Sequence, residues 1–129
     1  MRSTFSIVLF MSAFCGDAQA ENIHAVRPLT GYVCMQLNLS SDQGGASKEV
    51  PIREAPSASA RVVSYAANTV IVQASQPPVG GFLRVLRFTG EQGWVQASRL
   101  RPWSNPYAPS TRCTPSIMSD GKPGFGSAG

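Results

Sequence analysis

The stretch TVIVQASQPPVGGFLRVLRFTGEQGWVQ, residues 69–96, decides the fold class. It contains three short runs of β-branched, aromatic and other apolar residues, which are separated by the turn-forming clusters Gln76–Gly80 and Thr89–Gln92. Clusters of this kind mark the ends of strands, and the second is typical of a hairpin. No window of about 11–18 residues in the chain shows clean helical periodicity. The stretch therefore predicts three consecutive short strands.

Further strand-like runs lie on the N-terminal side of this stretch, at residues 31–38, 50–53 and 61–65. Strands that recur at such close spacing favour a small barrel or sandwich over alternating βαβ units. Valine side chains are expected to fill the interior, and Trp94 is expected to plug it where Gly93 lets the backbone bend. The expected core residues are Val62, Val63, Val70, Val72, Val85, Trp94 and Val95.

Residues 50–63, VPIREAPSASARVV, resemble the opening of bacterial SH3-like (SH3b) domains, where an apolar-x-apolar-Arg strand precedes a Pro/Ser turn and a basic residue. Residues 81–85 are similar to the aromatic strand of that family, and residues 93–95 to its Gly-Trp-Val motif. Residues 97–100 look like the turn of helix that closes the barrel. The resemblance covers residues 46–102. The sequence departs from the family pattern at Pro51, Ala55 and Phe82.

The resemblance implies an all-β fold with a small SH3-like barrel at residues 46–102. An extra N-terminal strand and loop are expected at residues 21–45. Residues 103–129 are expected to be an extended, Pro/Ser/Gly-rich tail, because such composition favours chain without a core of its own. Trp103 and Tyr107 are expected to pack against the barrel.

Residues 1–20 have the features of a secretory signal peptide. Arg2 precedes the apolar stretch FSIVLFMSAF, and Ala18-Gln19-Ala20 has the small-x-small pattern of a cleavage site. A bilayer span needs about 20 apolar residues, so no stable membrane span is expected after cleavage. An uncleaved anchor and a lipoprotein with lipid on Cys15 are the alternatives. The protein is thus expected to be periplasmic or secreted, with a Gram-negative periplasm favoured.

The cysteines agree with export. Cys15 would leave with the signal peptide, and Cys34 and Cys113 would remain as an even pair in an oxidising compartment. We expect these two cysteines to form a disulfide that holds the tail against the barrel. Two free thiols, or half of a metal site, are the alternatives, but zinc needs four ligands at short spacings.

The sequence offers little that points to catalysis. A Ser-His-Asp or Cys-His site needs a histidine beside the nucleophile, and the single histidine, His24, lies near the expected mature N-terminus. No Gly-rich loop followed by Lys-Ser/Thr, as phosphate binding requires, occurs in the chain. We therefore expect a protein that is not an enzyme and uses neither a cofactor nor a metal.

Binding is the expected activity. The net charge is +4, and the basic residues are scattered rather than gathered in a run, so a nucleic-acid partner is not expected. The SH3b family is associated with cell-wall peptides and peptidoglycan, and also with protein–protein contacts. Small barrels of this kind bind through loops and an aromatic-lined groove, in which Arg53 and Arg99 could bind a carboxylate. The alternative is that the aromatic residues cover the barrel and the arginines are solvated. The expected groove residues are Tyr65, Phe82, Arg84, Arg53 and Arg99.

Two functions therefore remain open at this point. The first is a recognition module that binds peptidoglycan or an acidic peptide. The second is an envelope protein that docks to another protein, or to itself, through its tail and an exposed strand edge. A hydrolase or a hydrolase inhibitor is a third and weaker alternative, because the SH3b fold also occurs appended to wall hydrolases.

Overall fold

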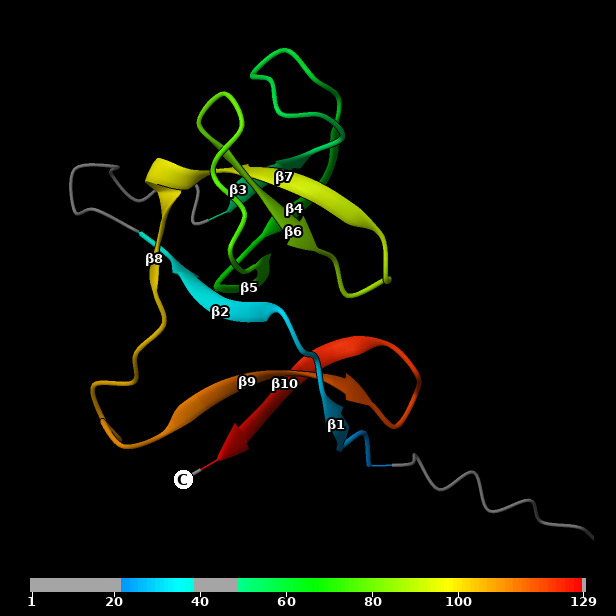
Figure 1. Cartoon of the computed structure of the whole chain (residues 1–129), viewed down its shortest axis with the longest axis vertical. Helices are drawn as coiled ribbons and strands as arrows, with labels where there is room; N and C mark the ends of the chain where they lie inside the picture. The colour runs from blue at the N-terminus through cyan, green and yellow to red at the C-terminus, as the bar shows by residue number, and fades with distance from the viewer. Residues whose placement is uncertain (1–21, 39–48, 129) are drawn as a thin grey trace, which may run out of the picture.

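The computed structural model describes residues 22–38 and 49–128, and they form two antiparallel sheets (Figure 1). The predicted all-β class is confirmed. The expected signal peptide, residues 1–20, lies outside the described residues. The elements in chain order are β1 (Ala25–Pro28), β2 (Tyr32–Leu37), β3 (Val50–Arg53), β4 (Val62–Ala66), β5 (Thr69–Gln73), β6 (Phe82–Leu86), β7 (Gln92–Gln96), the 3-10 turn η1 (Ala97–Arg99), β8 (Leu100–Pro102), β9 (Arg112–Met118) and β10 (Pro123–Ala128).

Seven strands form the larger sheet, in the order β4-β3-β7-β6-β5-β2-β8. The strands β5, β6 and β7 are the three consecutive strands that residues 69–96 predict. Their connections carry glycines with positive φ, such as Gly81 at +83° and Gly90 at +92°, which the turns require. A short η1 turn then leads the chain from β7 to β8, which pairs with β2.

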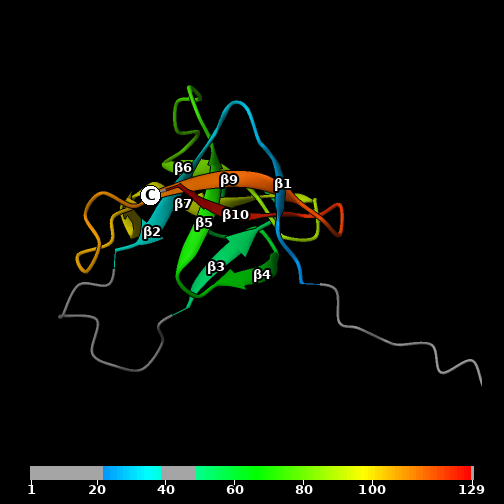
Figure 2. The same ribbon diagram turned by 90° about the horizontal axis from the view of Figure 1, so that it is seen from below.

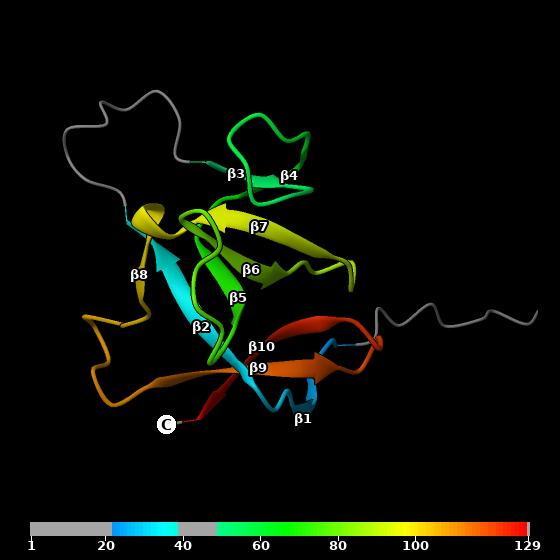
Figure 3. The same ribbon diagram turned by 45° about the horizontal axis from the view of Figure 1, so that its top comes forward.

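The larger sheet is not the closed barrel that we expected. Its two end strands, β4 and β8, are not paired with each other in the described part of the chain. Only Ala67 and Asn68 separate β4 from β5, yet β4 pairs with β3 and not with β5. The two strands therefore diverge, and Figure 3 shows β3 and β4 leading away from β5. An opening to the interior remains at this point.

The core lies on the inner face of the larger sheet. Four of the valines that we expected there are buried, and Val63 packs against them from a partly buried position. Val62 is only half-buried, because a register shift between β3 and β4 sets it opposite Arg53 instead of in the core. The buried cluster consists of Leu37, Val50, Ile52, Ala66, Val70, Val72, Val85, Val95 and Leu100.

The expected roles of Trp94 and Gly93 in the core are wrong. Trp94 is half-buried and absent from the core cluster, so it does not plug the interior. Gly93 faces the interior instead, where a Cβ would lie 2.4 Å from Cγ2 of Ile52. The glycine is therefore required by the close approach of Ile52, and not by a bend that accommodates the tryptophan ring.

Residues 112–128 are not the extended tail that we expected. They form the β9–β10 hairpin, and β1 pairs with the other side of β9 to complete a three-stranded sheet. The Gly/Pro composition suggested chain without regular structure, but two of the glycines allow close packing. A Cβ on Gly124 would lie 2.5 Å from Cγ of Met118, and one on Gly126 would lie 3.0 Å from Oγ of Ser116.

The two sheets are joined covalently, as predicted, by the Cys34–Cys113 disulfide, whose Cα atoms are 6.1 Å apart. The bond links β2 of the larger sheet to β9 of the smaller one, and these strands are in contact. Viewed from below, the β9–β10 hairpin lies across the larger sheet (Figure 2). Disulfides are typical of non-reducing compartments outside the cytoplasm. Within the described residues, no helix is long and apolar enough to cross a membrane.

Candidate functional site

Three side chains form a row across the outer face of the larger sheet. Trp94 of β7 stands opposite Arg84 of β6 on one side and opposite Arg53 of β3 on the other. Directly opposed residues of antiparallel strands share one face of the sheet. The Arg84 guanidinium lies 4.8 Å from the centroid of the Trp94 ring, which is the geometry of a cation–π contact. We call these three residues the Arg–Trp–Arg row.

The period of the strands places this row on the outside. Gly93 and Val95, the neighbours of Trp94, face the core, and so does Val85, the neighbour of Arg84. Successive side chains of a strand point to opposite faces, so Trp94 and Arg84 face outward. This alternation is visible in the sequence, and it could have assigned Trp94 to the surface. The size of the indole ring suggested a core residue instead.

The two arginines of the row differ in burial and in their bonding partners. Arg53 is partly buried, and its Nη1 donates a hydrogen bond of 2.9 Å to the carbonyl oxygen of Ala60. This bond anchors the loop between β3 and β4. Arg84 is exposed and forms no ion pair with any described residue. Its position on the indole face leaves guanidinium N–H groups able to bind a carboxylate, and such bonds are about twice as strong as neutral ones.

The five residues that the sequence predicted for a groove do not come together. Tyr65 is 57% exposed on the end strand β4 and borders a different hollow, described below. Phe82 is 6% exposed, so its expected place in a groove is wrong. Arg99 is half-buried in η1, with its Nε buried and unpaired in the described structure. Only Arg53 and Arg84 share a site, and Trp94 is the member that sequence reasoning missed.

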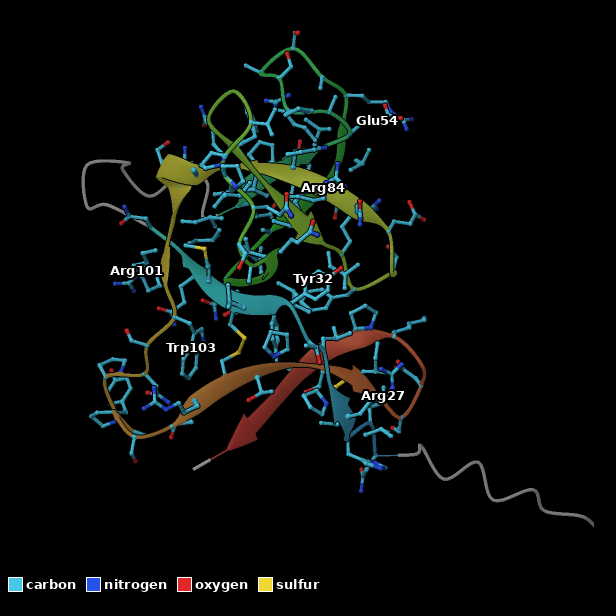
Figure 4. All side chains as sticks on the ribbon, viewed as in Figure 1. Arg27, Tyr32, Glu54, Arg84, Arg101 and Trp103 are labelled. Carbon is cyan, nitrogen blue, oxygen red and sulfur yellow. A yellow bond between two sulfur atoms is a disulfide. The ribbon has the colours of Figure 1, made fainter. Side chains whose placement is uncertain are left out.

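The two aromatic residues of the β8–β9 connection, Trp103 and Tyr107, differ in burial. Trp103 is half-buried and borders a hollow beside the disulfide, and Figure 4 shows it in this connection. Gln36 of β2 holds the connection in place, because its Nε2 donates a hydrogen bond of 2.8 Å to the carbonyl oxygen of Ser104. Tyr107 is 96% exposed, so the expectation that it packs against the barrel is wrong.

A second candidate site lies where β4 and β5 diverge. It is a mostly apolar cleft of about 390 Å³, a volume within the range of ligand pockets. Its floor includes the buried core residues Ile52, Val70 and Val85, which it reaches because the sheet does not close between β4 and β5. We call it the apolar cleft. Its aromatic lining comes from Tyr65, Phe88 and Phe125.

Groups suited to catalysis are sparse in the residues that the structure describes. His24 is exposed, and its Nδ1 lies 2.9 Å from the carbonyl oxygen of Asn22. Residues 22–38 and 49–128 contain no group of three or more His, Cys, Asp and Glu side chains that could hold a metal ion. No protein-family model, curated protein or solved structure matches this chain.

Proposed function

We propose that this protein is an extracytoplasmic, non-catalytic binding module of the bacterial SH3 type, and that it binds a carboxylate-bearing cell-wall peptide on the Arg–Trp–Arg row. The observation that carries the proposal is the cross-strand alignment of Arg53, Trp94 and Arg84 on one outer face.

The chemistry of the row supports a peptide that has both an apolar and an acidic part. The guanidinium of Arg84 is exposed and has no carboxylate partner among the described residues. Trp94 beside it offers an apolar surface. The stem peptides of peptidoglycan carry free carboxylates, and the described residues contain nine Arg and Lys against four Asp and Glu. Such an excess of positive charge favours an acidic partner.

The order of elements supports the SH3-type assignment. The strand with Arg53 is β3, the Pro/Ser turn lies between β3 and β4, and the Gly-Trp-Val motif lies in β7. The η1 turn follows β7 at residues 97–99, close to the turn of helix that the resemblance implies. The open sheet and the added β1–β9–β10 sheet depart from a simple closed barrel.

The disulfide supports the proposed compartment. Cys34 and Cys113 are bonded, as is typical of exported proteins. Together with the signal-like features of residues 1–20, the bond favours secretion, and we propose the periplasm as the site of action.

The test is a pull-down of the purified protein, residues 21–129, with insoluble peptidoglycan. We expect the wild type to be retained at low salt and released as salt rises, because the attraction is partly ionic. Arg84→Ala should weaken retention about tenfold or more, since a hydrogen bond to a charged group is lost.

The matched control is Arg101→Ala, which removes the same charge from an exposed residue of β8. Figure 4 shows Arg101 well apart from Arg84. The affinity of Arg101→Ala for peptidoglycan should differ from that of the wild type by less than about twofold to threefold. Equal weakening by both variants would show a general charge effect and refute the row as the site. No retention of the wild type at low salt would refute the function itself.

A second candidate function, docking to another envelope protein, is favoured by the position of β10. This strand is at one edge of the three-stranded sheet, and only β9 pairs with it in the described structure. An edge strand can pair with an added strand from a partner. Deleting residues 123–129 removes β10 and keeps the disulfide. If docking is the function, this deletion should abolish a complex that the full mature chain forms on size-exclusion chromatography.

A further inference from the structure

The apolar cleft is accessible from solvent and has a defined aromatic border. Tyr65 is 57% exposed and Phe88 is 50% exposed, although both are large apolar side chains. Phe88 meets Phe125 of β10 edge to face, with ring centroids 5.3 Å apart. The border therefore combines residues of the larger sheet with one of the smaller sheet. The floor is formed by the core.

One charged side chain lines this cleft, that of Arg87, just after β6. Its Cδ lies close to Gly93, and its Nη2 donates a hydrogen bond of 3.4 Å to the carbonyl oxygen of Val63 on β4. The arginine therefore extends across the interior from β6 towards β4. Its side chain is only 16% exposed.

The hydrogen bonds of Arg87 are incomplete. Its Nε is buried and has no partner in the described structure. A buried donor without a partner is unfavourable, and sites of this kind call for an explanation. Its one ion pair joins Nη1 to Oε2 of Glu91 at 3.0 Å, and the Glu91 side chain is 73% exposed. An exposed carboxylate can be replaced by another at little cost, because exposed ion pairs contribute little.

We propose that the apolar cleft binds a small amphipathic carboxylate, such as a medium-chain fatty acid, with its apolar part on the core floor and its carboxylate on Arg87. The charge of Arg87 selects an anion, since the other polar side chains that line the cleft are neutral: Ser64, Tyr65, Asn68, Thr69 and Thr89. A cavity of 150 Å³ accommodates a molecule of the size of benzene, so about 390 Å³ suits a ligand of roughly 10–15 non-hydrogen atoms. This site is separate from the Arg–Trp–Arg row.

The test is a calorimetric titration of residues 21–129 with dodecanoate below its micelle concentration, with dodecyltrimethylammonium as the cationic probe of equal chain length. We expect saturable binding of dodecanoate with one site, and at least tenfold weaker binding of the cation. Arg87→Met should lower the dodecanoate affinity about tenfold or more. Glu91→Gln should raise it about twofold to fivefold, because the competing carboxylate is removed.

The gain from Glu91→Gln keeps the test decisive if Arg87→Met fails to fold, since Glu91 is exposed and its loss should leave the fold intact. Ser64→Phe, which fills the cleft, should abolish binding, and Tyr107→Ala should leave it unchanged. The proposal is overturned if the cation binds as tightly as dodecanoate, or if Glu91→Gln has no effect or weakens binding. It is also overturned if the wild-type protein forms a dimer that does not bind dodecanoate, because a second copy would then cover the cleft.

Discussion

Gly93→Ala is the substitution whose effect the structure predicts most directly. The new Cβ would lie 2.4 Å from Cγ2 of Ile52, whereas carbon atoms in contact are about 3.5–4.0 Å apart, so the Ile52 side chain or one of the two strands must move by roughly 1 Å. Overpacking of this kind destabilises by about 1–3 kcal/mol. The φ of Gly93 is not in the left-handed region, so alanine can adopt this backbone conformation. Alanine also restricts the unfolded chain, which raises the free energy of unfolding by about 0.4–1 kcal/mol. We expect a net loss of about 1–2 kcal/mol.

Denaturation by guanidinium chloride measures this loss, and a double-mutant cycle with Ile52→Ala isolates its cause. Ile52→Ala alone should destabilise by about 2–5 kcal/mol, because it leaves a cavity. In that background Gly93→Ala should be neutral or slightly stabilising, since the methyl group that it would strike is gone. The interaction energy between the two sites should then be about 2 kcal/mol. If Gly93→Ala costs the same in both backgrounds, the close approach of β3 and β7 is not the reason for the glycine.

Three further outcomes follow from the contacts between elements. Replacing both cysteines by serine should lower the free energy of unfolding by up to about 4–5 kcal/mol, because the disulfide closes a loop across 79 residues; an unchanged melting temperature would contradict this. Arg53→Met should destabilise by about 1–2 kcal/mol through its lost bond to Ala60, while Arg61→Met, which breaks an exposed ion pair with Glu54, should cost less than about 1 kcal/mol in the same assay. Phe125→Leu should cost about 1 kcal/mol of aromatic contact with Phe88 and speed hydrogen exchange in β10, and unaltered exchange there would argue against this contact.

The sequence predicts those parts of the fold that depend on the local alternation of apolar and polar residues. Val70, Val72, Val85 and Val95 lie in runs whose period and turn signals are contained within a few residues, and all four are buried. The disulfide could also be predicted, because an even number of cysteines remains once Cys15 is assigned to the signal peptide.

The rest depends on contacts between distant segments. Nothing near Gly124 in the sequence indicates that its missing side chain makes room for Met118, so the β9–β10 hairpin resembled unstructured chain. The register shift that takes Val62 out of the core belongs to the pairing of two strands and not to either one. The sequence does not single out Arg87 as a site residue, because its burial arises from the path of its side chain past Gly93 to Val63 of β4.

The smaller sheet explains how an opening in a small core can persist. A sheet of this size buries only about 60% of the surface of its unfolded chain, so an uncovered opening into its interior would be costly. Phe125 of β10 lies against Phe88 at the border of the apolar cleft, so the smaller sheet covers part of the opening that β4 leaves. The Cys34–Cys113 bond fixes β9, and through it β10, against β2. Loss of the disulfide should therefore weaken dodecanoate binding in the cleft more than peptide binding on the Arg–Trp–Arg row, since none of the residues of the row comes from the smaller sheet.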